Sequence, residues 1–177
     1  MSNVTNWAID PTHSEINFKV KHLVISTVTG TFNSFSGSLE SDNETFEGAS
    51  IQFEADINSI DTNNEDRDNH LKSDDFFNAA DFPKMSFTSS SFTKNSDGNY
   101  SLKGELTIRD STNSVELDVV YGGTVVDPYG QTKAGFEATG VINRKEFGLQ
   151  WSAVTEAGNL VVSDEVRLIL NVQFTKQ

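Results

Sequence analysis

The sequence predicts an all-β protein that forms one extended antiparallel β-barrel of about eight strands, with a short helix near one end. Three observations support this prediction. Apolar and polar residues alternate with a period of two along most of the chain. Turn-forming residues separate the alternating runs, as at residues 95–99 and 127–130, and one segment alone breaks the alternation. The length of 177 residues suits one all-β unit, so residues 1–177 are expected to be a single domain.

The alternating runs define the expected inward face of each strand. Together with a strand pair within residues 30–39, they give eight or nine strands, a number at which a closed barrel can hold one small ligand. The residues expected to point inward are Ile16, Phe18, Val20, Ile51, Phe53, Ala55, Ile57, Met85, Phe87, Ser89, Ser91, Tyr100, Leu102, Gly104, Leu106, Ile108, Val115, Leu117, Val119, Tyr121, Phe136, Ala138, Gly140, Ile142, Val166, Leu168, Leu170, Val172 and Phe174.

The segment that breaks the β pattern covers residues 62–77. Thr62 and Glu65 have the spacing of a capping box, in which their side chains bond the free amides of a first helical turn. A short helix is therefore expected to run through Arg67 and Leu71, and the aromatic residues that follow it suit a plug over one mouth of the barrel.

Composition excludes several classes of function. The formal net charge is -13, which argues against nucleic acid and anionic membranes as partners. Cysteine is absent, so thiol chemistry and thiolate metal sites are excluded. No apolar run approaches a membrane span, and we expect no stable membrane insertion. Residues 1–7 do not read as a secretory signal, so a cytoplasmic location is expected, or a periplasmic one if a leader has been removed.

The expected inward faces mix large and small side chains. Four Phe residues share their faces with small residues, namely Ala55, Ser89, Gly104, Ala138 and Gly140. Small residues in the middle of a strand predict open space, and an apolar lumen of this kind suits a chain-like ligand held by buried area. The alternative is a packed barrel in which small residues pair with large ones across the interior.

Several motifs, in order along nearly the whole chain, resemble the YceI-like, polyisoprenoid-binding family. They are residues 7–14 (WAIDPTHS), 30–32 (GTF), 67–73 (RDNHLKS), 104–108 (GELTI) and 144–148 (RKEFG). The resemblance implies a lipocalin-like extended barrel whose lumen takes a long isoprenoid or fatty-acyl chain, with no known catalytic reaction.

The predicted site follows from the inward faces and the resemblance. The expected ligand contacts are Phe18, Val20, His22, Phe53, Phe87, Leu106, Phe136, Ala138, Ile142 and Leu168. Arg67, His70 and Arg144 are candidates for the mouth or for contact with a ligand head group. For the arginines, pairing with Asp68 or another carboxylate is the structural alternative.

The leading interpretation is non-catalytic binding or carriage of a polyisoprenoid, an isoprenoid quinone or a fatty-acyl lipid. No catalytic residue, metal site or cofactor is expected, because none of the common catalytic motifs occurs and the three histidines lack the spacing of a metal site. Two alternatives remain open. One is an enzyme that acts on such a lipid, and the other is a packed barrel that binds another protein. A homodimer through strand edges or a barrel mouth is also an open expectation.

Overall fold

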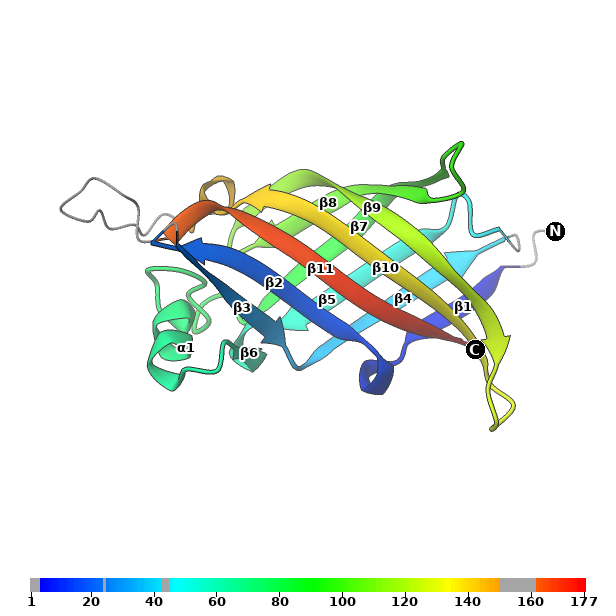
Figure 1. Cartoon of the computed structure of the whole chain (residues 1–177), viewed down its shortest axis with the longest axis horizontal. Helices are drawn as coiled ribbons and strands as arrows, with labels where there is room; N and C mark the ends of the chain where they lie inside the picture. Colours follow the sequence, from blue (N-terminus) through cyan, green and yellow to red (C-terminus); the bar gives the residue numbers. More distant parts are fainter. Residues whose placement is uncertain (1–3, 24, 43–44, 150–161) are drawn as a thin grey trace.

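In the computed structural model, which describes residues 4–23, 25–42, 45–149 and 162–177, the strands close into an antiparallel barrel (Figure 1). Every strand pairing is antiparallel, and β1 closes the ring by pairing with β11. The described strands are β1 (Thr5–Ile9), β2 (Glu15–His22), β3 (Ser26–Phe32), β4 (Phe35–Ser41), β5 (Ser50–Asp56), β6 (Ile60–Asp61), β7 (Lys84–Lys94), β8 (Tyr100–Ile108), β9 (Ser111–Val126), β10 (Thr132–Asn143) and β11 (Val162–Lys176).

Six of these strands form three composite strands, β1/β2, β3/β4 and β5/β6, each broken once in the middle. β11 pairs with both β1 and β2, which shows that the two pieces follow one line along the wall. The short 3-10 helices η1 (Pro11–His13) and η2 (Ile57–Ser59) mark two of the breaks. The barrel is therefore eight strands around, as the alternation predicted.

At the end of the barrel where α1 (Glu65–Lys72) lies, which we call the helix end, the strand pairing is interrupted. β6 pairs with β3 but has no pairing with β7 along these two described strands, so the ladder is interrupted there. The segment between them carries α1, which lies at one end of the barrel (Figure 1). This confirms the predicted short helix near one end.

The predicted start of the helix was wrong by two residues. Asn64, and not Thr62, is the N-cap, and its side-chain oxygen accepts a hydrogen bond from the Arg67 amide at 3.0 Å. Thr62 instead donates its hydroxyl and its amide to Asp68. Asn is a somewhat better N-cap than Thr, and a sequence with Thr62, Asn63 and Asn64 in a row offers more than one start.

Alternation places most of the expected residues inward, but β7 changes phase within its expected run. β7 has a bulge between Ser89 and Ser91 in its pairing with β8. The extra residue shifts the face that follows, so Phe92 is buried at 2% exposure and the expected inward Ser91 is not. The expectation for Ser91 was wrong for this reason.

Candidate functional site: an apolar lumen

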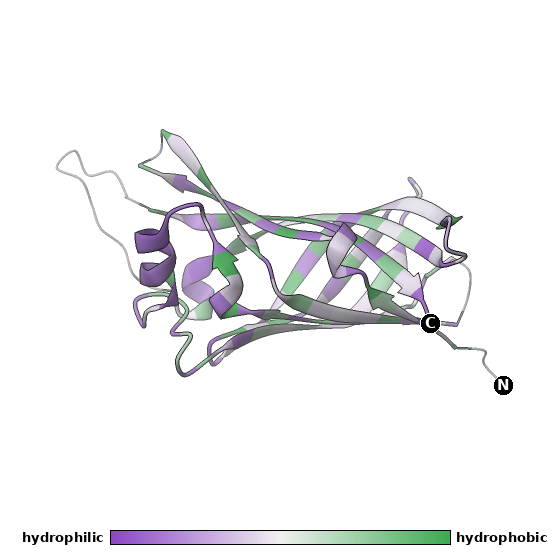
Figure 2. Ribbon diagram, turned by 90° about the horizontal axis from the view of Figure 1, so that it is seen from below, coloured by the Kyte–Doolittle hydropathy of each residue, from purple (hydrophilic) through white to green (hydrophobic). Residues whose placement is uncertain are grey.

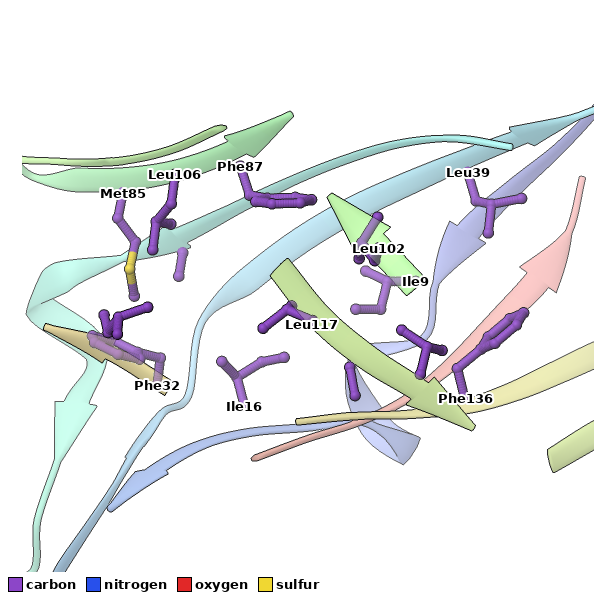
Figure 3. Packing of buried hydrophobic residues seen from close by; sticks show 14 of the residues in the cluster. Ile9, Ile16, Phe32, Leu39, Met85, Phe87, Leu102, Leu106, Leu117 and Phe136 are labelled. Carbon is purple, nitrogen blue, oxygen red and sulfur yellow. The ribbon is translucent and has the colours of Figure 1, made fainter. Parts of the chain in front are cut away.

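The barrel encloses a cavity of about 210 Å³. A void of about 10–15 Å³ is enough for one water, and packed interiors rarely leave more. Side chains from all eight strands around the ring line the cavity, and Figure 3 shows labelled members pointing toward a common interior. Three of the lining residues that the structure describes are polar: Asn17, Gln52 and Arg144. We call these lining residues the described lining. The interior is thus an apolar lumen and not a packed core.

The open space follows β11. Val166, Leu168, Leu170 and Val172 line the cavity in strict alternation, yet each is only half-buried. Lining residues on other strands are also half-buried, as at Phe18, Phe53 and Val115, but β11 carries four of them in succession. A strand rises about 3.3 Å per residue, so the cavity follows β11 for roughly 20 Å between the first and last of these four residues. Such a shape suits an extended chain better than a compact molecule.

Glycines on the inward face do not leave the space that the sequence suggested. A Cβ on Gly104 would lie 2.5 Å from the Phe87 ring, and one on Gly140 would lie 2.3 Å from a methyl carbon of Leu117. Neighbouring large side chains therefore already cover these glycines, an arrangement also found where aromatic rings cover glycine in designed sheets. The expectation of open space at Gly104 and Gly140 was wrong, whereas Ala138 does line the cavity.

The end of the barrel opposite α1 is filled by an aromatic cluster, which we call the end cluster. Phe46, from the connection between β4 and β5, lies at its centre, with ring centroids 5.3 Å from both Trp7 and Phe136. Its φ of 65° is unusual for a residue with a side chain, and its ring is 3% exposed. The members of the end cluster are Trp7, Phe46, Phe92, Tyr100, Tyr121, Phe136 and Phe174.

A hydrogen bond fixes the Phe46 connection to the wall. The Tyr100 hydroxyl donates to the carbonyl oxygen of Thr45, and burial raises the pKa of Tyr100. The Tyr100 ring also stacks on Phe92 with centroids 4.5 Å apart. This end of the lumen is therefore closed by interlocking rings.

An ion pair joins strands near this same end. Lys133 Nζ of β10 lies 2.7 Å from Asp10 Oδ2, and both side chains are largely buried. Lys133 also donates to Thr175 of β11, and His13 lies 2.8 Å from the same Asp10 oxygen. The hydrogen bond from Lys133 holds the pKa of Asp10 well below its usual range.

The helix end is closed by a mostly polar segment. α1 is almost wholly hydrophilic (Figure 2), and its one apolar residue, Leu71, lines the cavity together with Phe76 and Phe77. Arg109 holds this segment in place, because its Nη1 lies 3.1–3.2 Å from the carbonyl oxygens of Asp74, Phe76 and Gly148. A few apolar contacts and one arginine thus close this mouth.

Arg144 is buried at 2% exposure on the 3-10 helix η3 (Arg144–Phe147). Its guanidinium donates to the carbonyl oxygens of Ser163 at 2.9 Å, Leu149 at 2.6 Å and Val162 at 3.3 Å. Asp164 lies 3.6 Å away. Burial lowers the pKa of Arg144, and Asp164 opposes that effect. Arg144 therefore ties η3 to the start of β11.

The structure places the predicted site residues as follows. Phe18, Val20, Phe53, Phe87, Leu106, Phe136, Ala138, Ile142, Leu168 and Arg144 all line the cavity. The side chain of His22 lies outside the described residues.

Two candidates for the mouth lie away from the described lining. Arg67 donates to the hydroxyl and carbonyl oxygens of Thr62, and His70 Nε2 lies 2.9 Å from Asp75 Oδ2. Neither residue lines the cavity. Asp68 accepts from Thr62, and the carboxylate beside Arg144 is Asp164 at 3.6 Å, so Arg144 has another carboxylate than Asp68 as its neighbour. The contacts of Arg67, His70 and Asp68 hold α1 in position.

Sequence reasoning missed Phe46 and Arg109. Phe46 lies outside any alternating run, and no local signal marks a connection that folds into the lumen. Arg109 follows the last inward residue of β8, in a tight turn with a φ of 56°. Among the described residues, no three potential metal ligands converge, and no helix is long and apolar enough to cross a membrane.

Comparison with known proteins places this barrel among relatives of the same length. The model of the YceI-like domain matches residues 7–174. A UPF0312 protein of Staphylococcus epidermidis is 37% identical over 175 residues, which cover 97% of this chain and 98% of that protein. A UPF0312 protein of Staphylococcus aureus is 35% identical over 173 residues, with 97% and 98% covered.

Solved structures share the architecture. The YCEI protein of Campylobacter jejuni is 32% identical, with a TM-score of 0.75 over 89% of this chain and 90% of that chain. BcnA of Burkholderia cenocepacia has a TM-score of 0.81 at 21% identity, over 93% and 98%. A polyisoprenoid binding domain from Saccharophagus degradans has a TM-score of 0.69 at 16% identity, over 97% and 98%, and these two show the fold alone. The closed barrel, the motifs and the matched family model together show that the chain belongs to the YceI-like family.

Proposed function

We propose that this protein binds and carries one long apolar lipid, a polyisoprenoid, an isoprenoid quinone or a fatty-acyl chain, inside the barrel. One observation carries the proposal: apolar side chains that line the cavity remain half-buried along β11. Filling that space with a hydrocarbon chain would remove their surface from water, at about 25 cal/mol per Å². The name of the structurally similar domain from Saccharophagus degradans, a polyisoprenoid binding domain, agrees with this proposal.

Two alternatives have less support. An enzyme needs reactive groups at the ligand, but the described lining of the lumen contains no histidine, carboxylate or hydroxyl side chain. A packed interaction module needs a filled interior, whereas this barrel retains a cavity of about 210 Å³. Carriage therefore has more support than turnover or a packed interior.

The direct test is native mass spectrometry of freshly purified protein, followed by denaturation and lipid extraction of the same sample. We expect one bound isoprenoid or acyl lipid per chain, or stoichiometric uptake of such a lipid after exposure. A protein that stays free of lipid after exposure would contradict the proposal and favour the interaction module.

A lumen-filling variant tests the location. Ala138 lines the cavity from β10, so Ala138→Phe should occupy the ligand's space and weaken lipid affinity at least tenfold, while the barrel stays folded. Val141→Phe, on the same strand but 53% exposed, adds similar bulk outside and is the matched control. Titration with a fluorescent fatty acid compares them, and unchanged affinity in Ala138→Phe would place the ligand elsewhere.

A further inference from the structure

The lumen provides no uncommitted positive charge among the residues that the structure describes. Arg144 is the one charged side chain of the described lining. Its Nε and both terminal nitrogens already donate to backbone carbonyl oxygens, and Asp164 lies beside it. A charged head group drawn into this lumen would therefore lose its hydration without gaining a counter-ion, which is far more costly than burying a neutral polar group.

Charge at the helix end also disfavours an anion. Residues 61–81, which include α1 and the segment closing the mouth, carry seven carboxylates and two cationic side chains, Arg67 and Lys72. Seven carboxylates against two cations leave this segment with an excess of five negative charges. The net charge of the whole chain, -13, has the same sign. An anionic head group left in the mouth would be repelled over about a Debye length, roughly 8–10 Å.

Three other described cations near this mouth lie outside the lining of the lumen. Arg109 does not line the lumen, and its Nη1 donates to three carbonyl oxygens. Its buried Nε has no hydrogen-bond partner in the part of the chain that the structure describes. Lys145 Nζ lies 3.4 Å from Asp164. Lys21 follows the inward Val20 on β2 and is exposed, so it points away from the lumen.

We propose, resting on the proposed function, that this barrel selects lipids with an uncharged head, such as an alcohol, quinone, ester or amide. The same chain ending in a phosphate, diphosphate or carboxylate binds more weakly. The apolar lining holds the chain. Among the lining residues that the structure describes there is no free counter-ion, and this absence together with the acidic mouth discriminates between the heads.

The test compares lipids that differ only at the head. Geranylgeraniol, geranylgeranyl phosphate and geranylgeranyl diphosphate are titrated into the lipid-stripped protein, each below its critical micelle concentration, by displacement of a neutral fluorescent probe. We expect the alcohol to bind at least tenfold tighter than the monophosphate, with the diphosphate weakest. Added salt should reduce the difference, because it screens the acidic mouth.

A charge-neutralising pair of substitutions tests the contribution of the mouth. Glu65→Gln with Asp66→Asn removes two carboxylates from the exposed first turn of α1, outside the described lining. We expect affinity for geranylgeranyl phosphate to rise about threefold and affinity for geranylgeraniol to stay unchanged. Glu40→Gln with Glu137→Gln makes the same change in charge on exposed wall positions and should alter neither affinity.

The outcomes separate this inference from the proposed function. Failure of every lipid and of the neutral probe to bind would overturn the proposed function. Tight binding of geranylgeraniol with equal or tighter binding of the phosphate or diphosphate would overturn the selectivity alone. A threefold gain for the phosphate in the wall variant as well would show that net charge, and not the mouth, sets the preference, and would overturn that part of the proposal.

Discussion

The two ends of the barrel are closed by different kinds of interaction. The end cluster is built from rings on the strands themselves, with Phe46 folded in from a connection and held by Tyr100. The helix end is closed by a polar segment that lies outside the strand ladder and is held by Arg109. Aromatic burial gives several kcal/mol per ring, whereas partly exposed hydrogen bonds give about 1 kcal/mol each.

This difference separates stability from ligand exchange. The end cluster joins β1, β7, β8, β9, β10 and β11, so opening it would disturb most of the wall. The helix end lacks this continuity, because β6 and β7 are not paired there along the described strands. We therefore expect substitutions at the end cluster to change the free energy of unfolding, and substitutions at the helix end to change the rate of ligand release.

The largest effect is expected at Phe46. Phe46→Ala removes a buried ring that contacts Trp7, Tyr121 and Phe136, and should lower the free energy of unfolding by about 3–5 kcal/mol. Denaturation in guanidinium chloride measures the change. Phe46→Leu keeps most of the apolar volume and should lose less than half as much. Equal losses in both variants would mean that ring packing does not hold this end.

The ion pair of Asp10 and Lys133 should give an intermediate effect. Asp10→Asn removes the charge that Lys133 contacts, at a cost of about 2 kcal/mol. The pKa of Asp10 is lower in the folded protein than its unfolded value of about 3.9, so this contribution is present above about pH 4. It is lost as the pH falls toward the folded pKa.

Urea denaturation at several pH values checks the Asp10 prediction. The free energies of unfolding of the wild type and of Asp10→Asn should differ most at neutral pH and converge as the pH falls below 4. Asp118→Asn removes an exposed carboxylate on β9 and is the control. A constant difference at every pH would show that the loss comes from packing and not from ionisation.

A smaller loss of stability but a larger kinetic effect is expected at Phe77. Phe77 lines the cavity near α1, and its ring centroid is 6.1 Å from that of Phe32. Phe77→Ala should cost about 1–2 kcal/mol, since the residue is only half-buried. It should also speed release of a bound fluorescent fatty acid several-fold, as measured by stopped flow. Faster release from Phe46→Leu than from Phe77→Ala would reverse the assignment of the two ends.

The smallest change in stability is expected at Thr62. Thr62→Val removes the hydroxyl that donates to Asp68 and accepts from Arg67 Nε, at a cost of about 1 kcal/mol. Hydrogen exchange of α1 amides should rise while exchange in β8 and β9 stays unchanged. Faster exchange throughout the barrel would show that the helix end is coupled to the walls.

Alternation was sufficient to predict the walls of the barrel and most of the residues that line its lumen. A strand with one wet face places every second side chain inward, so Phe18, Phe136 and Leu168 could be assigned without a structure. The prediction failed where one extra residue shifts the phase, as before Phe92, because nothing in a run of serines marks a bulge.

Contacts between distant segments were harder to predict. Phe46 reaches the end cluster through a backbone conformation that Phe rarely adopts, and tertiary burial supports that conformation. Arg109 and Arg144 bind carbonyl oxygens of chain segments whose positions depend on the finished barrel. Gly104 was expected to leave open space, because the ring that covers it, that of Phe87, belongs to another strand.

A third glycine covered by a large side chain, Gly30 of β3, has a consequence for how the protein can evolve. Gly30 lies outside the described lining, yet a Cβ there would come within 2.2–2.9 Å of three ring atoms of Phe18, which does line the cavity. Alanine at position 30 would push that ring toward the ligand and narrow the bore. The residues that set the width of the lumen thus include one that does not line it. A substitution at such a position can change which lipid chain the barrel prefers, although the lipid does not touch it.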